Sequence, residues 1–333
     1  MANPTGMTTT TQVGPKYQYY AFSQLLPYGM PYTNTSVIAQ VKSLPKNEST
    51  VAHFTRVERL ETDPIQLTEG TTPDATQVTV TKIDATIKQY GRYIQLTDVV
   101  QDTSFEAVVN SFSSVLGDDL ACTLEQLNAV ELCSGTNAIF SNGTQRNAVN
   151  TAITKDAIKH AVRLLEGNYA KKVTSINNAA NLYNTSPIAP AYVAFCHSDL
   201  RGDIEALEGF VPVEKYASQK LIHPTEIGAI GQVRFLLNNF MTVAKDGGGT
   251  STGMISTGGS KADVYCVPVV GKDAFGVIDH TGYGNGKMYY VPVGEPSKGD
   301  PLAQKGSVGY KVWHAAKLLN DDFVVRIECA ATA

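Results

Sequence analysis

The sequence predicts an α+β fold in which a two-stranded excursion leads directly into one unusually long helix. Three observations support this prediction. Residues 45–98 contain two strand-like runs joined by a polar tip, and residues 104–132 repeat apolar side chains at helical spacing. Residues 191–299 then alternate strand-like and helix-like segments. A hydrophobic period that changes from two residues to three or four is typical of mixed domains.

The first 44 of the 333 residues are expected to form an N-terminal arm. Residues 1–16 are rich in Thr, Gly and Pro, and the segment after them turns aromatic before Pro27, Gly29 and Pro31 interrupt it. Such a segment runs extended and not as a continuous helix. Its rings are anchors either for a groove on a neighbouring subunit or for the chain's own core. They are Tyr17, Tyr19, Tyr20, Phe22, Tyr28 and Tyr32.

The excursion is predicted to be a bent hairpin. A strand is expected from Thr50 to Leu60 with Phe54 on its apolar face, and a return strand from Thr76. The apolar set shifts by one position before Ile83, which predicts a β-bulge or bend near Lys82. Residues 68–74 form the tip, where Gly70 can take a positive φ angle. Glu69 at the tip either pairs with a basic residue of a neighbour or stays solvated.

The long helix is predicted over residues 104–132. Apolar side chains recur at three- and four-residue steps from Phe105 to Val130, with Thr103 or Ser104 as the cap and Gly135 at the end. This helix is either a spine that serves an extended subunit or an ordinary core helix.

The remaining elements are expected to be short. They are a helix from Thr154 to Leu165, a connector from Asn177 to Pro190, a strand from Ala191 to Cys196, and a helix capped by Ser198 or Asp199 that ends near Glu208. Strands follow at 233–243 and 263–270 around a loop at 245–261, and two further strands meet at Asn320–Asp322.

Composition limits the function classes. The net charge is −4, with 27 basic and 31 acidic residues, which argues against a dedicated nucleic-acid binder but not against a container for DNA. Charged residues make up only 17% of the chain, so neighbours could cover part of its surface. The five cysteines show no metal or redox spacing, and buried thiols in a cytoplasmic product are expected. No apolar run is long enough to span a membrane.

No catalytic, cofactor-binding or metal-binding residues are expected. Cys196, His197, Ser198 and Asp199 are adjacent, and adjacent side chains on a strand or at a helix start point apart, so they cannot form a triad with one another. The six histidines lack ligand spacing, and Gly247–Gly249 is not followed by the residues of a phosphate loop. The chain is therefore not expected to be an enzyme.

Several short motifs resemble one known family. Pro45-Lys46-Asn47, Leu67-Thr68-Glu69-Gly70 and Gln89-Tyr90-Gly91 resemble the N-four coat-protein family of tailed bacteriophages, as do residues 222–228 and the C-terminal strands. The resemblance implies a Hong-Kong-97-like phage coat fold. Its expected parts are an arm (1–44), an extended loop (45–98), a peripheral domain (99–190) with the spine helix 104–132, an axial domain (191–299) and C-terminal strands completing the peripheral domain (300–333).

The resemblance also implies a function. We expect a major capsid protein that assembles with itself, as pentamers and hexamers, into the icosahedral head of a virion in the bacterial host cytoplasm. It would enclose DNA without reading its sequence, and it would meet scaffolding, portal and decoration proteins but no membrane. An encapsulin-like nanocompartment with an enzyme cargo, and an unrelated α/β enzyme, are the alternatives. Expected subunit contacts are the six aromatic arm residues and Pro45, Lys46, Leu67, Thr68, Glu69, Gly70, Gln89, Tyr90 and Gly91.

Overall fold

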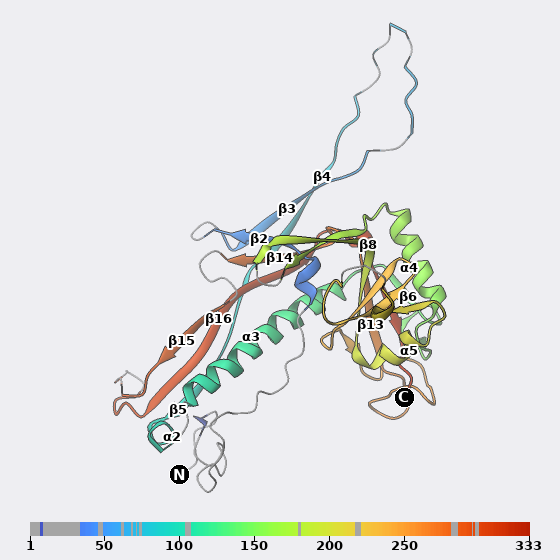
Figure 1. Cartoon of the computed structure of the whole chain (residues 1–333). Helices are drawn as coiled ribbons and strands as arrows, with labels where there is room; N and C mark the ends of the chain where they lie inside the picture. The colour runs from blue at the N-terminus through green and yellow to red at the C-terminus, as the bar shows by residue number, and fades with distance from the viewer. Residues whose placement is uncertain are drawn as a thin grey trace.

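A long β-ladder with one helix lying along it joins two other parts of the molecule, an extended hairpin and a second sheet (Figure 1). The computed structural model describes residues 7–8, 34–45, 49–60, 63–67, 69–70, 72, 75–103, 108–178, 181–216, 221–280, 286–294, 296 and 300–333. The α+β class is confirmed. The expected arm residues from Tyr17 to Tyr32, and Lys46 and Thr68 of the excursion, lie outside the described residues.

A six-stranded sheet carries the long ladder. Strand β5 pairs antiparallel with β16 over their whole shared length, from Thr97 opposite Lys305 to Lys88 opposite His314. The strands of this sheet are, in order, β1 (Met7–Thr8), β5 (Lys88–Thr97), β16 (Lys305–Leu318), β14 (Phe275–His280) and β2 (Gln40–Leu44), with β15 (Lys287–Val291) also on β16.

Helix α3 (Val108–Leu132) lies along this ladder (Figure 1). It follows a short helix, α2 (Asp98–Thr103), and residues 104–107 between the two are outside the described part, so the expected cap cannot be placed. Leu116 is buried against Leu96, Val308 and Val312 of the sheet, as an amphipathic helix requires. Val130 was expected on the same face, but its side chain is 57% exposed, so that part of the prediction was wrong.

A nine-stranded sheet forms the second body. Its order is β6 (Ala138–Phe140), β17 (Val324–Cys329), β13 (Val264–Val270), β8 (Asn181–Cys196), β11 (Val233–Leu237), β10 (Glu226–Ile230) and β9 (Phe210–Pro212), with β12 (Val243–Ala244) on β13 and β7 (Val173–Asn178) on β8. Helices α4 (Lys155–Gly167) and α5 (Arg201–Glu205) pack in one core of this sheet, and the end of α3 packs in the other. Thr154 caps α4, which confirms that predicted helix.

The excursion begins as a two-stranded hairpin of β3 (Val51–Val57) and β4 (Val80–Thr86). Phe54 and Ala85 face inward while His53 and Thr55 are exposed, so the predicted alternation is confirmed. The pairing of β3 with β4 is regular from Val51 to Val57, so the bulge predicted near Lys82 is wrong. The break comes instead at Ile87, where the chain leaves β3 and begins to pair with β16.

Three other local predictions were wrong. The sequence predicts a connector over 177–190, but residues 177–178 end β7 and residues 181–190 begin β8, which pairs antiparallel with β7 and crosses the expected domain boundary at residue 191. The segment 233–243 is not one strand, because β11 ends at Leu237 and β12 begins at Val243. The helix expected to run to Glu208 ends at Glu205, and His197, rather than Ser198 or Asp199, caps the 3-10 turn before it.

The two C-terminal strands separate. Strand β16 belongs to the six-stranded sheet and β17 to the nine-stranded sheet, with a 3-10 turn (η5, Asp321–Phe323) between them. The expected break at Asn320–Asp322 is confirmed. Because β16 pairs with β14 and β17 pairs with β13, the C-terminal segment contributes one strand to each sheet.

Candidate subunit-contact surfaces

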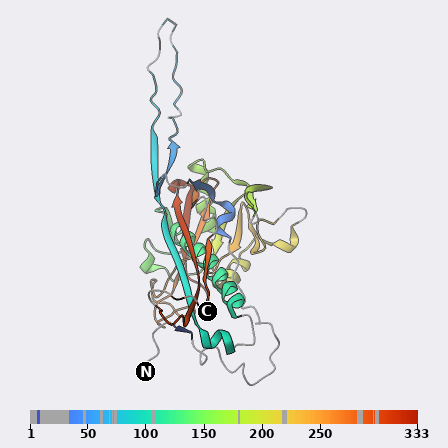
Figure 2. The same ribbon diagram turned by 90° about the vertical axis from the view of Figure 1, so that its left-hand side faces the viewer.

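The β3–β4 hairpin continues into a loop that extends away from the rest of the molecule (Figures 1 and 2). Gly70 at its tip has a φ of +79°, which confirms the expected left-handed position. Leu67, Glu69 and Gly70, all expected contacts, are exposed there, as is Pro45 before β3.

The base of this loop is well anchored. Phe54 packs with Ile278 and Leu319, and Lys42 lies 4.4 Å above the centre of its ring. Arg56 Nη1 donates to Asn320 Oδ1 at 2.8 Å. The hairpin is therefore fixed to the six-stranded sheet at its root.

Glu58 closes the base of the loop. Its Oε1 accepts from the Thr81 hydroxyl at 2.7 Å and from Arg56 Nη2 at 2.7 Å. Hydrogen bonds from Thr81 first, and then from Arg56, lower the pKa of Glu58 below its ordinary range. The carboxylate thus stays ionised and holds both strands where the regular pairing ends.

Beyond that base the loop exposes apolar side chains. Ile65 and Leu67 are 63% and 70% exposed. Val57, Leu60, Val78 and Val80 are also exposed. A row of exposed aliphatic side chains on an extended loop is costly in water, and it indicates a protein contact surface.

A second surface lies on the face of the six-stranded sheet away from α3. Gly309 of the central strand β16 lies between Tyr93 of β5 and Tyr289 of β15, and it is the register partner of both. The two tyrosines are 66% and 41% exposed. We call this surface the tyrosine groove, and its cavity measures about 330 Å³. Two residues further along the strands, Lys287 of β15, Lys311 of β16 and Gly91 of β5 lie side by side.

Two glycines form the floor of the tyrosine groove. A Cβ atom on Gly309 would lie 2.7 Å from Tyr93 Cβ, and one on Gly91 would lie 2.6 Å from the Tyr310 carbonyl oxygen. Both distances are too short for any side chain, so the groove depends on these glycines. Gln89 and Gly91, both expected contacts, are exposed on β5, whereas Tyr90 is half-buried against the α3 side of the sheet.

Apart from Pro45, the described contact candidates therefore form two groups that do not meet within one chain. Leu67, Glu69 and Gly70 lie on the loop, and Gln89 to Gly91 lie on the ladder. Separate patches on one subunit suit contacts between copies.

No pattern in the sequence predicted the buried polar cluster where the N-terminal segment, α3 and the two sheets meet. Glu125 of α3 is 2% exposed. Its Oε1 accepts from the backbone N–H groups of Asn34 at 3.2 Å and Thr35 at 3.0 Å, and its Oε2 accepts from the Thr35 hydroxyl at 2.9 Å. The Asn238 side-chain amide also donates to it. Burial raises the pKa of Glu125, and these donors oppose the rise.

The cluster continues to the six-stranded sheet. Asn128 donates to the Thr35 hydroxyl at 3.1 Å and accepts from His314 Nε2 at 2.8 Å. Thr35 lies in η1 (Thr35–Ile38), His314 in β16, and Asn238 directly after β11. The cluster therefore joins the root of the N-terminal segment to the helix and to both sheets.

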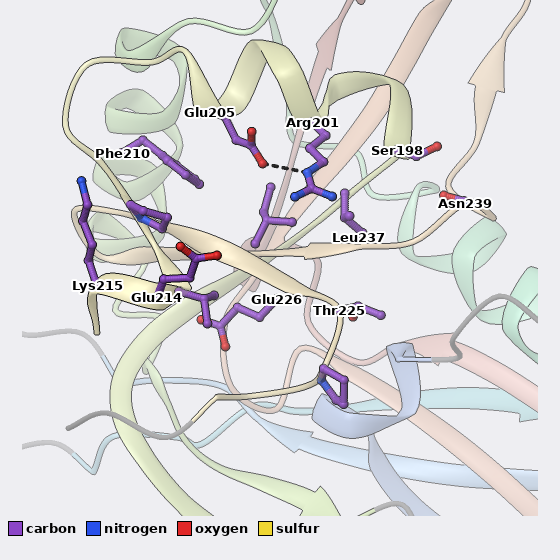
Figure 3. Close-up of a pocket in the computed structure, with 14 residues that line it drawn as sticks. Ser198, Arg201, Glu205, Phe210, Glu214, Lys215, Thr225, Glu226, Leu237 and Asn239 are labelled. Atoms are coloured by element: carbon purple, nitrogen blue, oxygen red, sulfur yellow. Dashed lines mark hydrogen bonds and ion pairs between the residues drawn. The ribbon is translucent and has the colours of Figure 1, made fainter. Parts of the chain in front are cut away.

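A pocket of about 910 Å³ lies beside α5, β9 and β10 (Figure 3). Arg201 points toward Glu205, with Nε 2.7 Å from Oε1, and Glu214 and Lys215 lie on the opposite side. Glu226 is already engaged by the Ile222 N–H at 2.7 Å and by the Tyr216 hydroxyl at 3.0 Å. The pocket offers paired charges and no activated nucleophile.

The Cys196–Asp199 segment does not assemble a catalytic triad. The Cys196 thiol donates to the Leu236 carbonyl at 3.5 Å, and burial raises its pKa to about 12. Ser198 donates to Asp199, which also accepts from the Tyr265 hydroxyl at 2.7 Å. Within the described residues no group of three or more His, Cys, Asp or Glu side chains could hold a metal ion. No helix in that part of the chain is both long and apolar enough to cross a membrane.

The chain is similar in sequence to known phage capsid proteins. A family model described as "Phage capsid protein" matches residues 80–327, well over half of the chain. The chain is 24% identical over 226 residues to the major capsid protein of Pseudomonas phage KPP21. That match covers 62% of this chain and spans 57% of the KPP21 protein.

Solved structures give the same fold over nearly the whole chain. The capsid of Ralstonia phage GP4 matches with a TM-score of 0.69 and 13% identity, covering 98% of both chains. The head structure of Helicobacter pylori bacteriophage KHP40 matches with a TM-score of 0.65 and 10% identity, covering 97% of both chains. The capsid of cyanophage P-SCSP1u matches at 0.60 and 14% identity, covering 99% of both chains.

Proposed function

The chain belongs to the phage capsid protein family, and from this premise we propose that it is a major capsid protein that builds the head shell of a tailed bacteriophage. The shell is icosahedral and encloses the double-stranded DNA genome. The protein is a structural subunit of the virion and not an enzyme. The family predicted from Pro45-Lys46-Asn47 and the other motifs is confirmed at the level of phage capsid proteins.

One observation carries the structural role. The β3–β4 loop exposes Leu60, Ile65 and Leu67 far from the chain's own cores, while its root is held by Phe54 and Arg56. A loop anchored at its base that exposes several aliphatic side chains gains stability when another molecule covers those side chains. In a shell, the neighbouring copy is that molecule.

The tyrosine groove is the surface we assign to this loop on the neighbour. Residues 58–79 carry five carboxylates and one cation, whereas Lys311 lines the groove and Lys287 lies opposite it on β15. The apolar loop side chains match the Tyr93 and Tyr289 rings, and the opposite charges fix their relative position. Isolated surface pairs contribute about 0–1 kcal/mol each, so the apolar contact provides most of the affinity.

The other partners follow from the shell. Scaffolding and portal proteins take part during assembly, and a decoration protein can bind outside. The net charge of −4 supports enclosure of DNA without sequence-specific binding. The arm (1–44), loop (45–98), peripheral (99–190 and 300–333) and axial (191–299) parts remain our working division of the subunit, with the aromatic arm reaching a neighbour. Assembly takes place in the cytoplasm of the bacterial host.

Electron micrographs of the purified protein test the proposal. We expect closed shells of uniform size, whose ultraviolet absorbance ratio is that of nucleic acid when they are isolated from infected cells. A monodisperse small oligomer under every condition would contradict the function. Shells that carry an enzyme and no DNA would favour the encapsulin-like alternative.

A further inference from the structure

A bulky residue occupies a backbone position that normally suits glycine, directly after α4. Tyr169 has a φ of +58°. Its N–H donates to the Glu166 carbonyl at 3.0 Å, and the next N–H, of Ala170, donates to the Leu165 carbonyl at 2.9 Å. These two bonds form a turn that often closes helices, and its left-handed residue is usually glycine because a Cβ atom is unfavourable there. The backbone is therefore strained at Tyr169.

The core of the nine-stranded sheet does not explain why a tyrosine stands at this position. Leu165 and Ala170, on either side of the turn, are buried in that core and hold the backbone in place. Tyr169 itself is 66% exposed, so its ring contributes little to the core. A strained residue that its surroundings keep in place indicates a role outside the packing of the core.

The partner of Tyr169 comes from the extended loop. The guanidinium carbon of Arg59 lies 3.8 Å from the centre of the Tyr169 ring. A planar guanidinium stacks on an aromatic face, and the electrons of the ring attract its charge. Arg59 comes directly after Glu58, whose N–H donates to the Thr79 carbonyl at 2.9 Å just beyond the end of β3. The contact therefore holds the loop where it leaves the paired strands.

We propose that Tyr169 is a positioning residue for the extended loop: by stacking with Arg59, it fixes the direction in which the loop leaves the subunit. Phe54 and Arg56 attach the root of the loop to the six-stranded sheet. The stacking adds an attachment to the body built on the nine-stranded sheet, and two separate attachments define a direction better than one. The role of this direction in assembly rests on the proposed function, whereas the direction within one subunit does not.

Distances measured in the unassembled subunit test the inference. Spin labels are attached at Gln66→Cys on the loop and at Lys159→Cys on α4, in a chain that also carries Cys122→Ser. Both labelled positions are exposed, and the four remaining cysteines are buried and stay unlabelled in the folded protein. Double electron–electron resonance should give a narrow distribution of distances between the two labels.

Two variants of the labelled chain remove the contact. Tyr169→Gly removes the ring and supplies the residue that the left-handed backbone favours, and Arg59→Gln removes the cation. Both should broaden the distance distribution. Tyr169→Phe is the matched control, because it keeps the ring and should leave the distribution narrow. Distributions that stay narrow in Tyr169→Gly and Arg59→Gln would overturn the inference, as would a Tyr169→Phe distribution as broad as that of Tyr169→Gly.

Circular dichroism melting checks that the variants are folded. Tyr169→Gly should not melt below the parent chain, since relief of the strained backbone offsets the lost contact. If this variant nevertheless failed to fold, Arg59→Gln would decide the question. The Arg59 side chain is exposed and lies beyond the paired strands, so its loss leaves the cores intact.

Shell assembly tests what the fixed direction does. A loop that already points one way loses less conformational freedom when a neighbour covers it. The protein concentration at which shells form should therefore rise about two- to fivefold in Tyr169→Gly and Arg59→Gln, the factor that one exposed cation–π contact represents. It should stay unchanged in Tyr169→Phe. Equal concentrations for all variants would overturn the role in assembly. If even the wild type formed no shells, the proposed function would fail, and the label distances would still test Tyr169.

Discussion

Glu125 of α3 links the helix to the N-terminal segment at Asn34 and Thr35 and to Asn238 after β11. It is a buried carboxylate with four hydrogen-bond donors from two segments, and no cation is among them. Burying an ionised group is costly unless its lone pairs are satisfied. Here the donors come from backbone and side-chain amides and a hydroxyl, so the carboxylate organises the segments around it.

Replacing Glu125 by Ala should therefore destabilise the folded subunit by roughly 2–4 kcal/mol, because it leaves buried donors such as the Thr35 N–H without an acceptor. Glu125→Gln should cost less. Its amide oxygen can still accept the three donors at the Oε1 position, and its NH₂ can donate to the Thr35 hydroxyl. Urea unfolding of both variants, compared with the wild type, measures the difference. Equal losses for the two variants would contradict this account.

His314 should make the subunit acid-sensitive. Burial lowers its pKa from the ordinary 6.5 to about 4, so the unfolded chain binds more protons than the folded one between these values. Stability is therefore fully present above pH 6.5 and falls as the pH drops toward 4. Burial also lowers the pKa of His223, which adds a change of the same sign. The raised pKa of Glu125 acts in the opposite direction.

Unfolding free energies of wild type and His314→Gln across that range test the prediction. Glutamine keeps a donor for Asn128 Oδ1 but does not titrate. We expect the variant to lose part of the slope between pH 6.5 and pH 4 and to keep the part that comes from His223. An unchanged slope would show that His314 is already charged in the folded state.

At the scale of elements, the β5–β16 ladder depends on glycine where its strands approach most closely. Gly91→Ala places a methyl group 2.6 Å from the Tyr310 carbonyl oxygen, so β5 must shift and we expect a loss of about 1–3 kcal/mol. Gly117→Ala is the matched control, since nothing lies within 4 Å of its Cβ position on α3. That variant should gain about 0.5–1 kcal/mol through helix propensity. Thermal unfolding of both variants gives the comparison, and a stable Gly91→Ala would argue against the close contact.

Apolar periodicity located α3 but not its full buried face. Leu116 is buried as predicted. Near the helix end the buried positions are Glu125, Asn128, Ala129 and Leu132, while Val130 faces outward. A pattern that counts only apolar residues assigns a buried Glu and Asn to the solvent side. The missing information lies in their partners Asn34, Asn238 and His314, which are distant in sequence.

Two further local predictions were wrong because residue composition and apolar pattern do not show which strand will pair with a segment. The Asn-, Ala- and Pro-rich stretch 177–190 resembles a connector, yet residues 177–178 end β7 and residues 181–190 lie in β8, because each strand supplies the other's hydrogen bonds. The shift of apolar residues before Ile83 predicts a bulge or bend, but Val78 and Val80 are exposed. The apolar residues therefore change from the solvent-facing side to the inward side of the hairpin, while the pairing of β3 with β4 stays regular.

At the scale of the whole molecule, the sequence predicted the loop but not the tyrosine groove that we assign to it on the neighbouring copy. Leu67, Glu69 and Gly70 could be selected because a turn signal stood between two alternating runs. The tyrosine groove combines residues from β5, β15 and β16. No local sequence pattern predicts that Tyr93, Gly309 and Tyr289 lie side by side on these strands. Only strand register brings them together.

The assignment of loop to groove makes the sharpest prediction for assembly. Ile65→Ser/Leu67→Ser should leave the subunit fold unchanged, because both side chains are more than 60% exposed and contribute little to any core of the chain. The same double variant should reduce shell yield at a given protein concentration, since each loop loses apolar area that the neighbour would cover. Sedimentation of assembled particles measures the yield, and circular dichroism melting of the unassembled subunit checks the fold.

Gln66→Ser is the matched control, because it alters the polar residue between the two at the same place on the loop. It should assemble like the wild type. Tyr93→Ser in the tyrosine groove should instead reproduce the loss of the loop variant, and combining the two should cost less than the sum of the separate effects, because both remove one contact. Full shell yield from the Ile65→Ser/Leu67→Ser variant would remove the loop from the assembly interface. Fully additive losses would separate the loop from the groove, and the neighbour's surface would then have to be sought elsewhere on the subunit.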